Sequence, residues 1–260
     1  MYDAFSVDYD RFVNWNDRLG FEMPFLLRQL DPLAHRDGQP ARILDAACAT
    51  GRHAIALAMR GFTAAGADLS PAMINLAKAN AVEAAVSTSF LAAGFGQLKD
   101  AFAASPLFPF DAVLCLGNSL PHLLTPIDLA AALTDFAAVL RSGGKVIIQN
   151  RNFDVVLLQR ERWMEPQSHR EGSQEWIFAR FYDFDPDGLI TFNIMTLHRR
   201  DQESWQQRIT STRLRPLRQS ELTAALAATG FGDIAAFGSL GGAVFDPASS
   251  GNLVLVASKL

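Results

Sequence analysis

The sequence has few cysteines, and neither of them suggests a metal site or a disulfide. The 260 residues contain only Cys48 and Cys115, and their separation matches neither a zinc-binding pattern nor a disulfide framework. Both lie in apolar segments, where a small, reduced, buried side chain is the expected role. We therefore expect no metal in this protein, and the reduced thiols favour a cytoplasmic location.

The sequence also lacks an excess of basic charge and long apolar runs. The net charge is −4 and 19% of the residues are charged, so no positive surface is predicted for a nucleic acid or an anionic membrane. No apolar run is long enough to span a bilayer, and the first residues do not resemble a signal peptide. With 49% hydrophobic residues, the chain suits a globular protein with a sizeable core.

Strand and helix patterns alternate through the first part of the chain. Short buried strands are predicted at residues 42–46, 63–67, 111–116 and 145–150, and helices at 53–60, from Ser70 and Pro71 onward, and at 128–140. Residues 141–144 are predicted to end the last of these helices. Such alternation predicts a parallel sheet with helices on both faces.

The pattern then changes to polar–apolar alternation, which is typical of antiparallel strands. Residues 176–182 and 189–197 flank a hairpin-type turn at 185–188, and 205–214 is a further strand. A helix at 220–228, a strand near Ile234 and a strand at 252–258 follow. We expect an N-terminal helical cap at 1–40, a core at 41–150, an antiparallel insertion or lid at 151–215, and the end of the core at 216–260.

Basic residues in the insertion allow two interpretations. They could contribute substrate contacts from a lid, or they could form a solvated sheet face. These residues are His169, Arg170, Arg180, His198, Arg199 and Arg200.

The turn after the first strand carries the first chemical motif, Ile43-Leu44-Asp45-Ala46-Ala47-Cys48-Ala49-Thr50-Gly51-Arg52. Its small residues let a ligand lie against the backbone, and the carboxylate of Asp45 can accept from an ammonium group. The second strand ends at Asp68, where a carboxylate can accept hydrogen bonds from two ribose hydroxyls. A pyrophosphate-containing dinucleotide fits less well, because the turn is poor in glycine and Asp45 would repel phosphate.

Three segments resemble a known family. Asp45–Gly51 together with Asp68-Leu69-Ser70 is similar to motif I and the following acidic motif of class I S-adenosylmethionine methyltransferases. Cys115–Leu123 and Asn150–Asp154 resemble the segments after strands four and five of glycine N-methyltransferases and glycine/sarcosine N-methyltransferases. The resemblance implies a Rossmann-like seven-stranded class I methyltransferase sheet with an antiparallel insertion after strand five. Ala49 departs from the family, which usually has glycine there, and a slightly altered turn is expected.

The resemblance also implies binding residues for S-adenosylmethionine. Asp68 would hold the ribose, Ala47 would line the methionine part, and Gly94 with Phe95 would flank the adenine. The complete expected set is Trp15, Arg18, Asp45, Ala47, Gly51, Asp68, Leu69, Gly94, Phe95, Leu116 and His122. Within it, Trp15 resembles an aromatic residue that closes over the cofactor, and Arg18 would meet the cofactor's carboxylate.

Asn118 and Arg151 match the positions that receive the carboxylate of the amino-acid substrate. Arg151 follows a central strand, and a guanidinium can grip a carboxylate with two parallel hydrogen bonds. Alone, Asn118 would suit a turn and Arg151 an exposed strand end.

Strand four lacks the tetrad of nucleic-acid amino-methyltransferases, which favours a small-molecule substrate. We expect in-line N-methylation of a glycine-like amino acid. The alternatives are O- or C-methylation of another metabolite, or a non-catalytic S-adenosylmethionine-binding module. The oligomeric state stays open.

Overall fold

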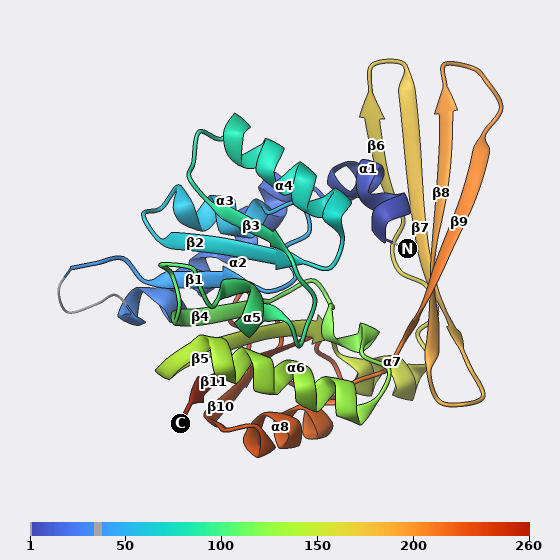
Figure 1. The fold of residues 1–260 in the computed structure, drawn as a ribbon. Helices are drawn as coiled ribbons and strands as arrows, with labels where there is room; N and C mark the ends of the chain where they lie inside the picture. Colours follow the sequence, from blue (N-terminus) through green and yellow to red (C-terminus); the bar gives the residue numbers. More distant parts are fainter. Residues whose placement is uncertain (1, 34–37) are drawn as a thin grey trace.

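The computed structural model describes residues 2–33 and 38–260, which form two β-sheets and their covering helices. One sheet has seven strands in the order β10-β11-β5-β4-β1-β2-β3, and the other has four strands in the order β6-β7-β8-β9 (Figure 1). The seven-stranded class I methyltransferase sheet and the antiparallel insertion after strand five are thus confirmed.

Parallel strands make up most of the larger sheet. These strands are β1 (Arg42–Asp45), β2 (Thr63–Asp68), β3 (Ser89–Ala92), β4 (Phe110–Cys115) and β5 (Leu140–Arg151). Two strands close one edge in antiparallel orientation, β11 (Asn252–Lys259) beside β5 and β10 (Phe231–Phe237) outside it. Every residue of β4 is buried, as expected for a central strand that is covered on both faces.

Alternate residues of the strands supply two separate cores, one on each face of the sheet. Ile43 and Leu114 pack with α2 (Trp15–Leu30), α3 (Arg52–Ala58) and α4 (Pro71–Glu83). Leu44 and Val113 pack on the opposite face with α5 (Leu98–Phe102), α6 (Pro126–Val139) and α8 (Gln219–Ala228). The period of two that governs side-chain direction along a strand explains this division.

Capping residues define where two of these helices begin. The Ser70 hydroxyl accepts from the backbone N–H of Met73 at 3.2 Å, and Pro71 occupies the first turn of α4, as the sequence predicts. Helix α6 begins in the same way, with Thr125 accepting from the N–H of Asp128 at 3.2 Å.

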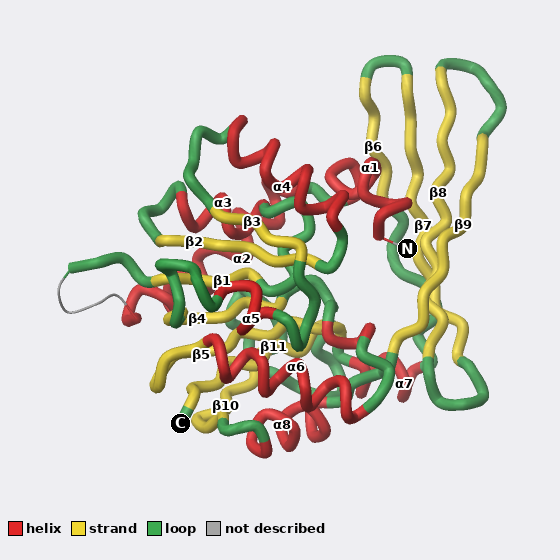
Figure 2. The backbone as a smooth tube through the Cα atoms, viewed as in Figure 1, coloured by secondary structure: helices red, strands yellow, loops and turns green. Residues whose placement is uncertain are grey.

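The antiparallel sheet lies beside the carboxyl ends of the parallel strands, which the strand arrows mark (Figure 1), and Figure 2 shows the two sheets side by side. It consists of β6 (Gln167–Glu171), β7 (Gln174–Phe184), β8 (Ile190–Arg200) and β9 (Gln206–Leu214). Two helices connect it to the core. Phe153 of α7 (Phe153–Gln159) packs with Tyr182, and Phe12 of α1 (Tyr2–Phe12) packs with Phe178. The insertion therefore stands where ligands of open α/β sheets bind.

The structure differs from the sequence prediction in one boundary and in several short elements. Residues 141–144 do not separate α6 from the next strand, because they form the first part of β5. The pairing of β4 with β5 shifts register between Phe110 and Ala112, and Gly143 has a φ of 71°, so this irregular segment continues the strand. Strands β3 and β6, helices α5 and α7, and the short 3₁₀ turns Asp31–Leu33 and Leu120–His122 are additional. No helix in residues 2–33 or 38–260 is long and apolar enough to cross a membrane.

Candidate active site

A cavity of about 600 Å³ lies between the carboxyl ends of the parallel strands and the insertion. Its volume is within the range of about 300–1,000 Å³ that is usual for small-molecule sites. The cavity brings together residues from α1, α2, the strand ends and the insertion. The predicted site residues that line it are Arg18, Ala47, Asp68, Leu69, Gly94, Phe95, Leu116, Asn118, His122 and Arg151. Their roles in binding remain predictions.

The Asp68 carboxylate is held at the end of β2 by two backbone groups. One oxygen, Oδ2, accepts from the N–H of Ala49 at 2.9 Å, and Oδ1 accepts from the N–H of Ser70 at 2.9 Å. Ala49 reaches this position with a φ of 45°, a left-handed conformation that glycine adopts more easily. The turn thus keeps its bond to Asp68 although glycine is absent.

Asp45 is buried behind the cavity and does not line it. Its side chain ends β1 at 2% exposure, and its Oδ1 has no hydrogen-bond partner among the described residues. Burial raises the pKa of Asp45 to about 6, and the nearby Asp68 acts in the same direction, whereas His53 and Arg18 oppose it. This carboxylate lacks a cationic or hydrogen-bonding partner on one oxygen, which is costly for a buried acid.

Trp15 and Gly51 also lie outside the cavity lining. Trp15 donates from Nε1 to Asp10 Oδ1 at 2.8 Å and packs edge-on against His53, with the Arg18 guanidinium over its ring. Gly51 has a φ of 77°, and a Cβ there would lie 2.7 Å from the Phe90 ring. The structure therefore gives Gly51 a packing role, and the expected cofactor contacts of both residues stay predictions.

Asp10 attaches α1 to the turn after β1. Its Oδ1 accepts from the Thr50 hydroxyl at 2.6 Å, and its Oδ2 accepts from Arg52 at 2.7 Å. Since α1 carries the cavity residues Tyr9 and Phe12, these bonds hold one wall of the cavity in place.

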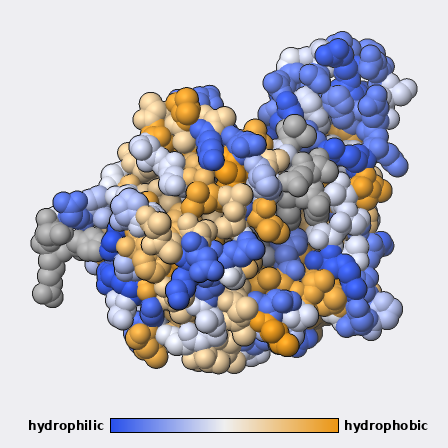
Figure 3. Space-filling view, viewed as in Figure 1, coloured by the Kyte–Doolittle hydropathy of each residue, from blue (hydrophilic) through white to orange (hydrophobic). Residues whose placement is uncertain are grey.

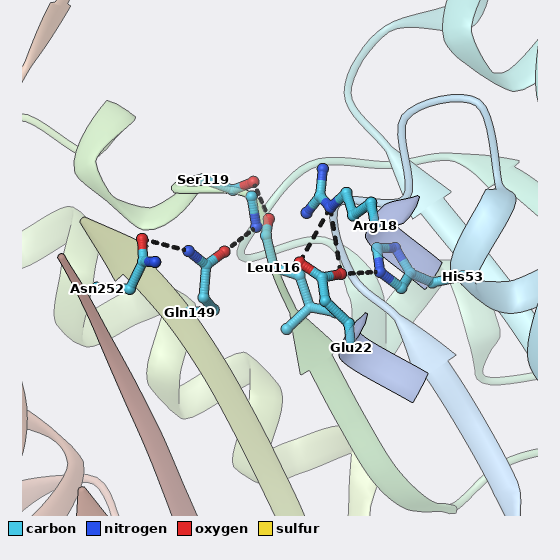
Figure 4. A network of polar contacts seen from close by, with 8 residues as sticks. Arg18, Glu22, His53, Leu116, Ser119, Gln149 and Asn252 are labelled. Atoms are coloured by element: carbon cyan, nitrogen blue, oxygen red, sulfur yellow. Dashed lines mark hydrogen bonds and ion pairs between the residues drawn. The ribbon is translucent and has the colours of Figure 1, made fainter. Parts of the chain in front are cut away.

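Glu22 links helix α2 to helix α3 through its bonds to Arg18 and His53 (Figure 4). The Arg18 Nε donates to both carboxylate oxygens of Glu22 at 3.1 Å, and His53 Nε2 lies 2.6 Å from Glu22 Oε2. Burial acts to raise the pKa of Glu22, but the hydrogen bond to His53 and the charge of Arg18 outweigh it and hold the pKa below its usual value. The sequence analysis missed this pair, although the spacing of Arg18 and Glu22, one helical turn, could have indicated it.

Gln149 positions the loop after β4. Its Oε1 accepts from the N–H of Gly117 at 2.8 Å, and its Nε2 donates to Asn252 Oδ1 at 3.1 Å (Figure 4). Both Gln149 and Asn252 line the cavity. No pattern in the sequence indicates this contact, because it depends on β11 lying beside β5.

Asn118 and Arg151, the two residues predicted to hold the acceptor's carboxylate, lie together at the cavity. Asn118 has a φ of 67°, and its Oδ1 accepts from the backbone N–H of Arg151 at 2.9 Å. The Asn118 amide nitrogen makes no bond to a described residue, so it can donate into the cavity. Arg151 donates from one terminal nitrogen to Glu161 at 2.9 Å, while its buried Nε has no partner among the described residues.

His122 and Tyr182 supply neutral groups to the cavity. Burial lowers the pKa of His122 to about 4, so its imidazole is uncharged at neutral pH. Burial raises the pKa of Tyr182 to about 12, so its phenol keeps its proton and can donate. No cluster of three or more potential metal ligands occurs in the described part of the chain.

The basic residues of the insertion divide into two groups. Arg170 and Arg199 both pair with Glu175, at 2.8 and 2.6 Å, and they belong to the projecting part of the insertion, whose visible surface is mostly hydrophilic (Figure 3). Arg180 instead lines the cavity, with its guanidinium 4.9 Å from the centre of the Phe12 ring. The solvated-face interpretation thus describes the first group, and Arg180 takes the position expected of a lid residue.

Sequence comparison relates the chain to methyltransferases. Residues 43–144 match a family model described as a methyltransferase domain. The chain is similar to a glycine/sarcosine N-methyltransferase of Aphanothece halophytica, with 32% identity over 60% of this chain and 55% of that protein. A second one, from Parasynechococcus marenigrum, is 35% identical over 60% of this chain and 52% of that protein. The chain thus spans about half the length of the curated relatives it matches.

Structural comparison extends the likeness to the whole chain. An S-adenosylmethionine-dependent methyltransferase from Clostridium acetobutylicum superposes with a TM-score of 0.74 at 15% identity, over 99% of this chain and 98% of that one. The S-adenosylmethionine-bound amino pentose methyltransferase CalS10 from Micromonospora echinaspora gives a TM-score of 0.69 at 21% identity, over 99% and 97%. At these identities the likeness establishes the fold. In sequence, the chain is similar to methyltransferases over residues 43–144 and to glycine/sarcosine N-methyltransferases over 60% of its length, and its fold is that of S-adenosylmethionine-dependent methyltransferases.

Proposed function

We propose that this protein binds S-adenosylmethionine and methylates the amino nitrogen of a small, glycine-like acceptor. The observation that carries the proposal is the division of charge around the cavity. Asp68 lines one part, with the buried Asp45 behind it and the paired Arg18 and Glu22 close to neutral, and Arg151 and Arg180 line the part formed by β5 and β7. A cationic cofactor suits the acidic part, and an acceptor with a carboxylate suits the basic part.

The acidic part fits the cofactor in three respects. Asp45, buried behind the cavity with one oxygen unpartnered, contributes negative charge that favours a cationic ligand. Two backbone bonds hold the Asp68 carboxylate at the cavity, where it can accept from ribose hydroxyls. Leu69 is 76% exposed and lines the cavity with Phe95, so both offer apolar surface to an adenine. When bound, S-adenosylmethionine supplies an electrophilic methyl group on a sulfonium.

The basic part would position the acceptor. Arg151 Nε and the Asn118 amide nitrogen are donors suited to a carboxylate, and holding that end fixes the direction of the amine. An amine in its neutral form already has the lone pair that attacks, and the proton that it loses afterwards can pass to solvent. Correct positioning alone can supply about 7–11 kcal/mol of such a barrier.

The ionisable groups of the cavity favour an amine over a hydroxyl or an enol. Methylation at oxygen or carbon needs a general base with a pKa near the working pH. The pKa of His122 is about 4, which makes it a weak base, and the Tyr182 phenol, with a pKa of about 12, remains protonated. Glu22 is engaged by Arg18 and His53.

Calorimetry tests cofactor binding. S-adenosylmethionine and S-adenosylhomocysteine should both bind, and Asp68→Ala should weaken both by about tenfold to a hundredfold through the loss of charge-assisted hydrogen bonds. Asp187→Ala is the control, because Asp187 lies in an exposed turn of the insertion and pairs with Arg213. Tight NAD binding without S-adenosylmethionine binding would refute the cofactor assignment. Cofactor binding with no methyl transfer to a broad panel of small acceptors would indicate a binding module.

A further inference from the structure

Arg180 stands out among the charged residues of the cavity because nothing in the described structure neutralises it. It extends from β7, and its guanidinium carbon lies 4.9 Å from the centre of the Phe12 ring. Its Nε is buried without a hydrogen-bond partner. None of the acidic side chains that the structure describes forms an ion pair with it.

The other arginines of the cavity are paired. Arg18 donates to Glu22 at 3.1 Å, and Arg151 donates to Glu161 at 2.9 Å. Each of these pairs is close to neutral, so the uncompensated positive charge in this part of the cavity belongs to Arg180. Burial is the main cause that lowers the pKa of Arg180 from its usual value, and the positive charge of the neighbouring Arg151 acts in the same direction. An arginine keeps its proton even so, and its N–H donors that lack an acceptor make it suited to bind an anion.

The contact with Phe12 prepares the guanidinium for such a ligand. A guanidinium that lies over an aromatic face is fixed in one plane, while its N–H groups point outward along that plane. Stacking therefore orients Arg180 but satisfies none of its hydrogen-bond donors. Tyr182, two residues further along the same strand, also lines the cavity, so it provides a neutral donor on the same side.

We propose that Arg180 is a specificity-determining residue, which binds the acceptor's carboxylate beside Arg151 and restricts the acceptor to a single anionic group. This inference rests on the proposed function. Since Glu161 already balances Arg151, a single carboxylate balances Arg180 and leaves the site neutral. A second anionic group, as in a dicarboxylic or phosphorylated amino acid, would meet no further free cation among the described cavity residues and would be repelled by Glu161.

Direct binding of small probes tests this assignment without relying on turnover. Glycine and sarcosine would each be compared with its amide by calorimetry on the S-adenosylhomocysteine-loaded protein. The wild type should prefer the carboxylates by at least tenfold. Arg180→Gln should remove most of that preference and weaken carboxylate binding by about tenfold to a hundredfold, whereas Arg180→Lys should restore part of it. The control is Arg162→Gln, which removes an exposed arginine that pairs with Asp183.

A second variant tests the charge balance. Glu161→Gln leaves Arg151 unpaired, so it should improve the binding of aspartate relative to glycine by about tenfold, the effect of one charged contact. The proposal is overturned if the wild type does not distinguish carboxylate from amide, if Arg180→Gln keeps the preference, or if the wild type binds aspartate better than glycine. Failure of the proposed function looks different, because then either S-adenosylhomocysteine does not bind or the loaded wild type binds neither glycine nor sarcosine.

Discussion

Replacing Asp45 with asparagine should make the free protein more stable and the cofactor complex weaker. The wild-type carboxylate is buried, one of its oxygens has no partner among the described residues, and its pKa is raised from 3.8 to about 6, chiefly by burial. At neutral pH the folded protein therefore holds a buried charge that has a lower free energy in the unfolded chain, where water solvates it. Asparagine keeps the shape of the side chain and removes the charge.

The size and sign of the effect follow from proton linkage. Below pH 3.8 the carboxyl group is protonated in both states and costs nothing. Between pH 3.8 and about 6 the unfolded chain has lost the proton while the folded one keeps it, so the stability falls as the pH rises. Each pH unit of pKa difference corresponds to about 1.4 kcal/mol, so the loss reaches about 3 kcal/mol above pH 6. Asp45→Asn should recover up to that amount at pH 7.

Urea denaturation of the free wild type and of Asp45→Asn at several pH values measures this difference. The gain should be near zero at pH 3.5 and grow to its full value by about pH 7. Asp111→Asn is the matched control, because Asp111 is equally buried but bonded to Arg42 and Arg141, so its replacement should destabilise. Calorimetry should show weaker S-adenosylmethionine binding to Asp45→Asn. A variant that is no more stable than the wild type at pH 7 would refute the reasoning.

Two further predictions concern the turn after β1 and the acceptor site. Ala49→Gly should stabilise the protein by about 1 kcal/mol in urea denaturation, because the φ of 45° at Ala49 costs an alanine about 1–2 kcal/mol and glycine loses part of that gain in entropy. Ala47→Gly, in the same turn without positive φ, should destabilise, and the reverse order would contradict this account. Arg151→Lys should lower kcat/KM for the best acceptor nearly as much as Arg151→Ala, by a factor that corresponds to about 1.5–3 kcal/mol. The reason is that an ammonium cannot form the two parallel hydrogen bonds of a guanidinium. Unchanged turnover in Arg151→Ala would remove Arg151 from the site.

Local patterns in the sequence were sufficient to predict the parallel strands of the larger sheet. Buried parallel strands have short apolar runs, and the strand–turn–helix order around Asp45 and Asp68 predicts adjacent parallel strands. Since parallel strands end at the same edge of the sheet, topology brings Asn118 and Arg151 together, and Asn118 Oδ1 accepts from the backbone N–H of Arg151 at 2.9 Å. Their role in binding the acceptor stays a prediction. Short edge elements such as β3, with four residues, carry too little pattern to be recognised.

The remainder of the site depends on tertiary contacts between distant elements. Glu22 reaches His53 only because α2 packs beside α3, and Gln149 meets Asn252 only because β11 returns beside β5. Arg180 stood among several basic residues of the insertion that look alike in sequence. The structure separates them, because Arg170 and Arg199 pair with Glu175 whereas Arg180 lines the cavity, and the role proposed for Arg180 rests on that difference.

The most direct test of the central claim is the position of the transferred methyl group. The protein would be incubated with S-adenosylmethionine labelled in its methyl group and with glycine, sarcosine or dimethylglycine, and the products would be examined by NMR and mass spectrometry. The account predicts label on the nitrogen of at least one of these acceptors, with the corresponding amide a much poorer substrate. Label on an oxygen or a carbon atom of a different acceptor, or preferred methylation of acceptors without a carboxylate, would contradict it.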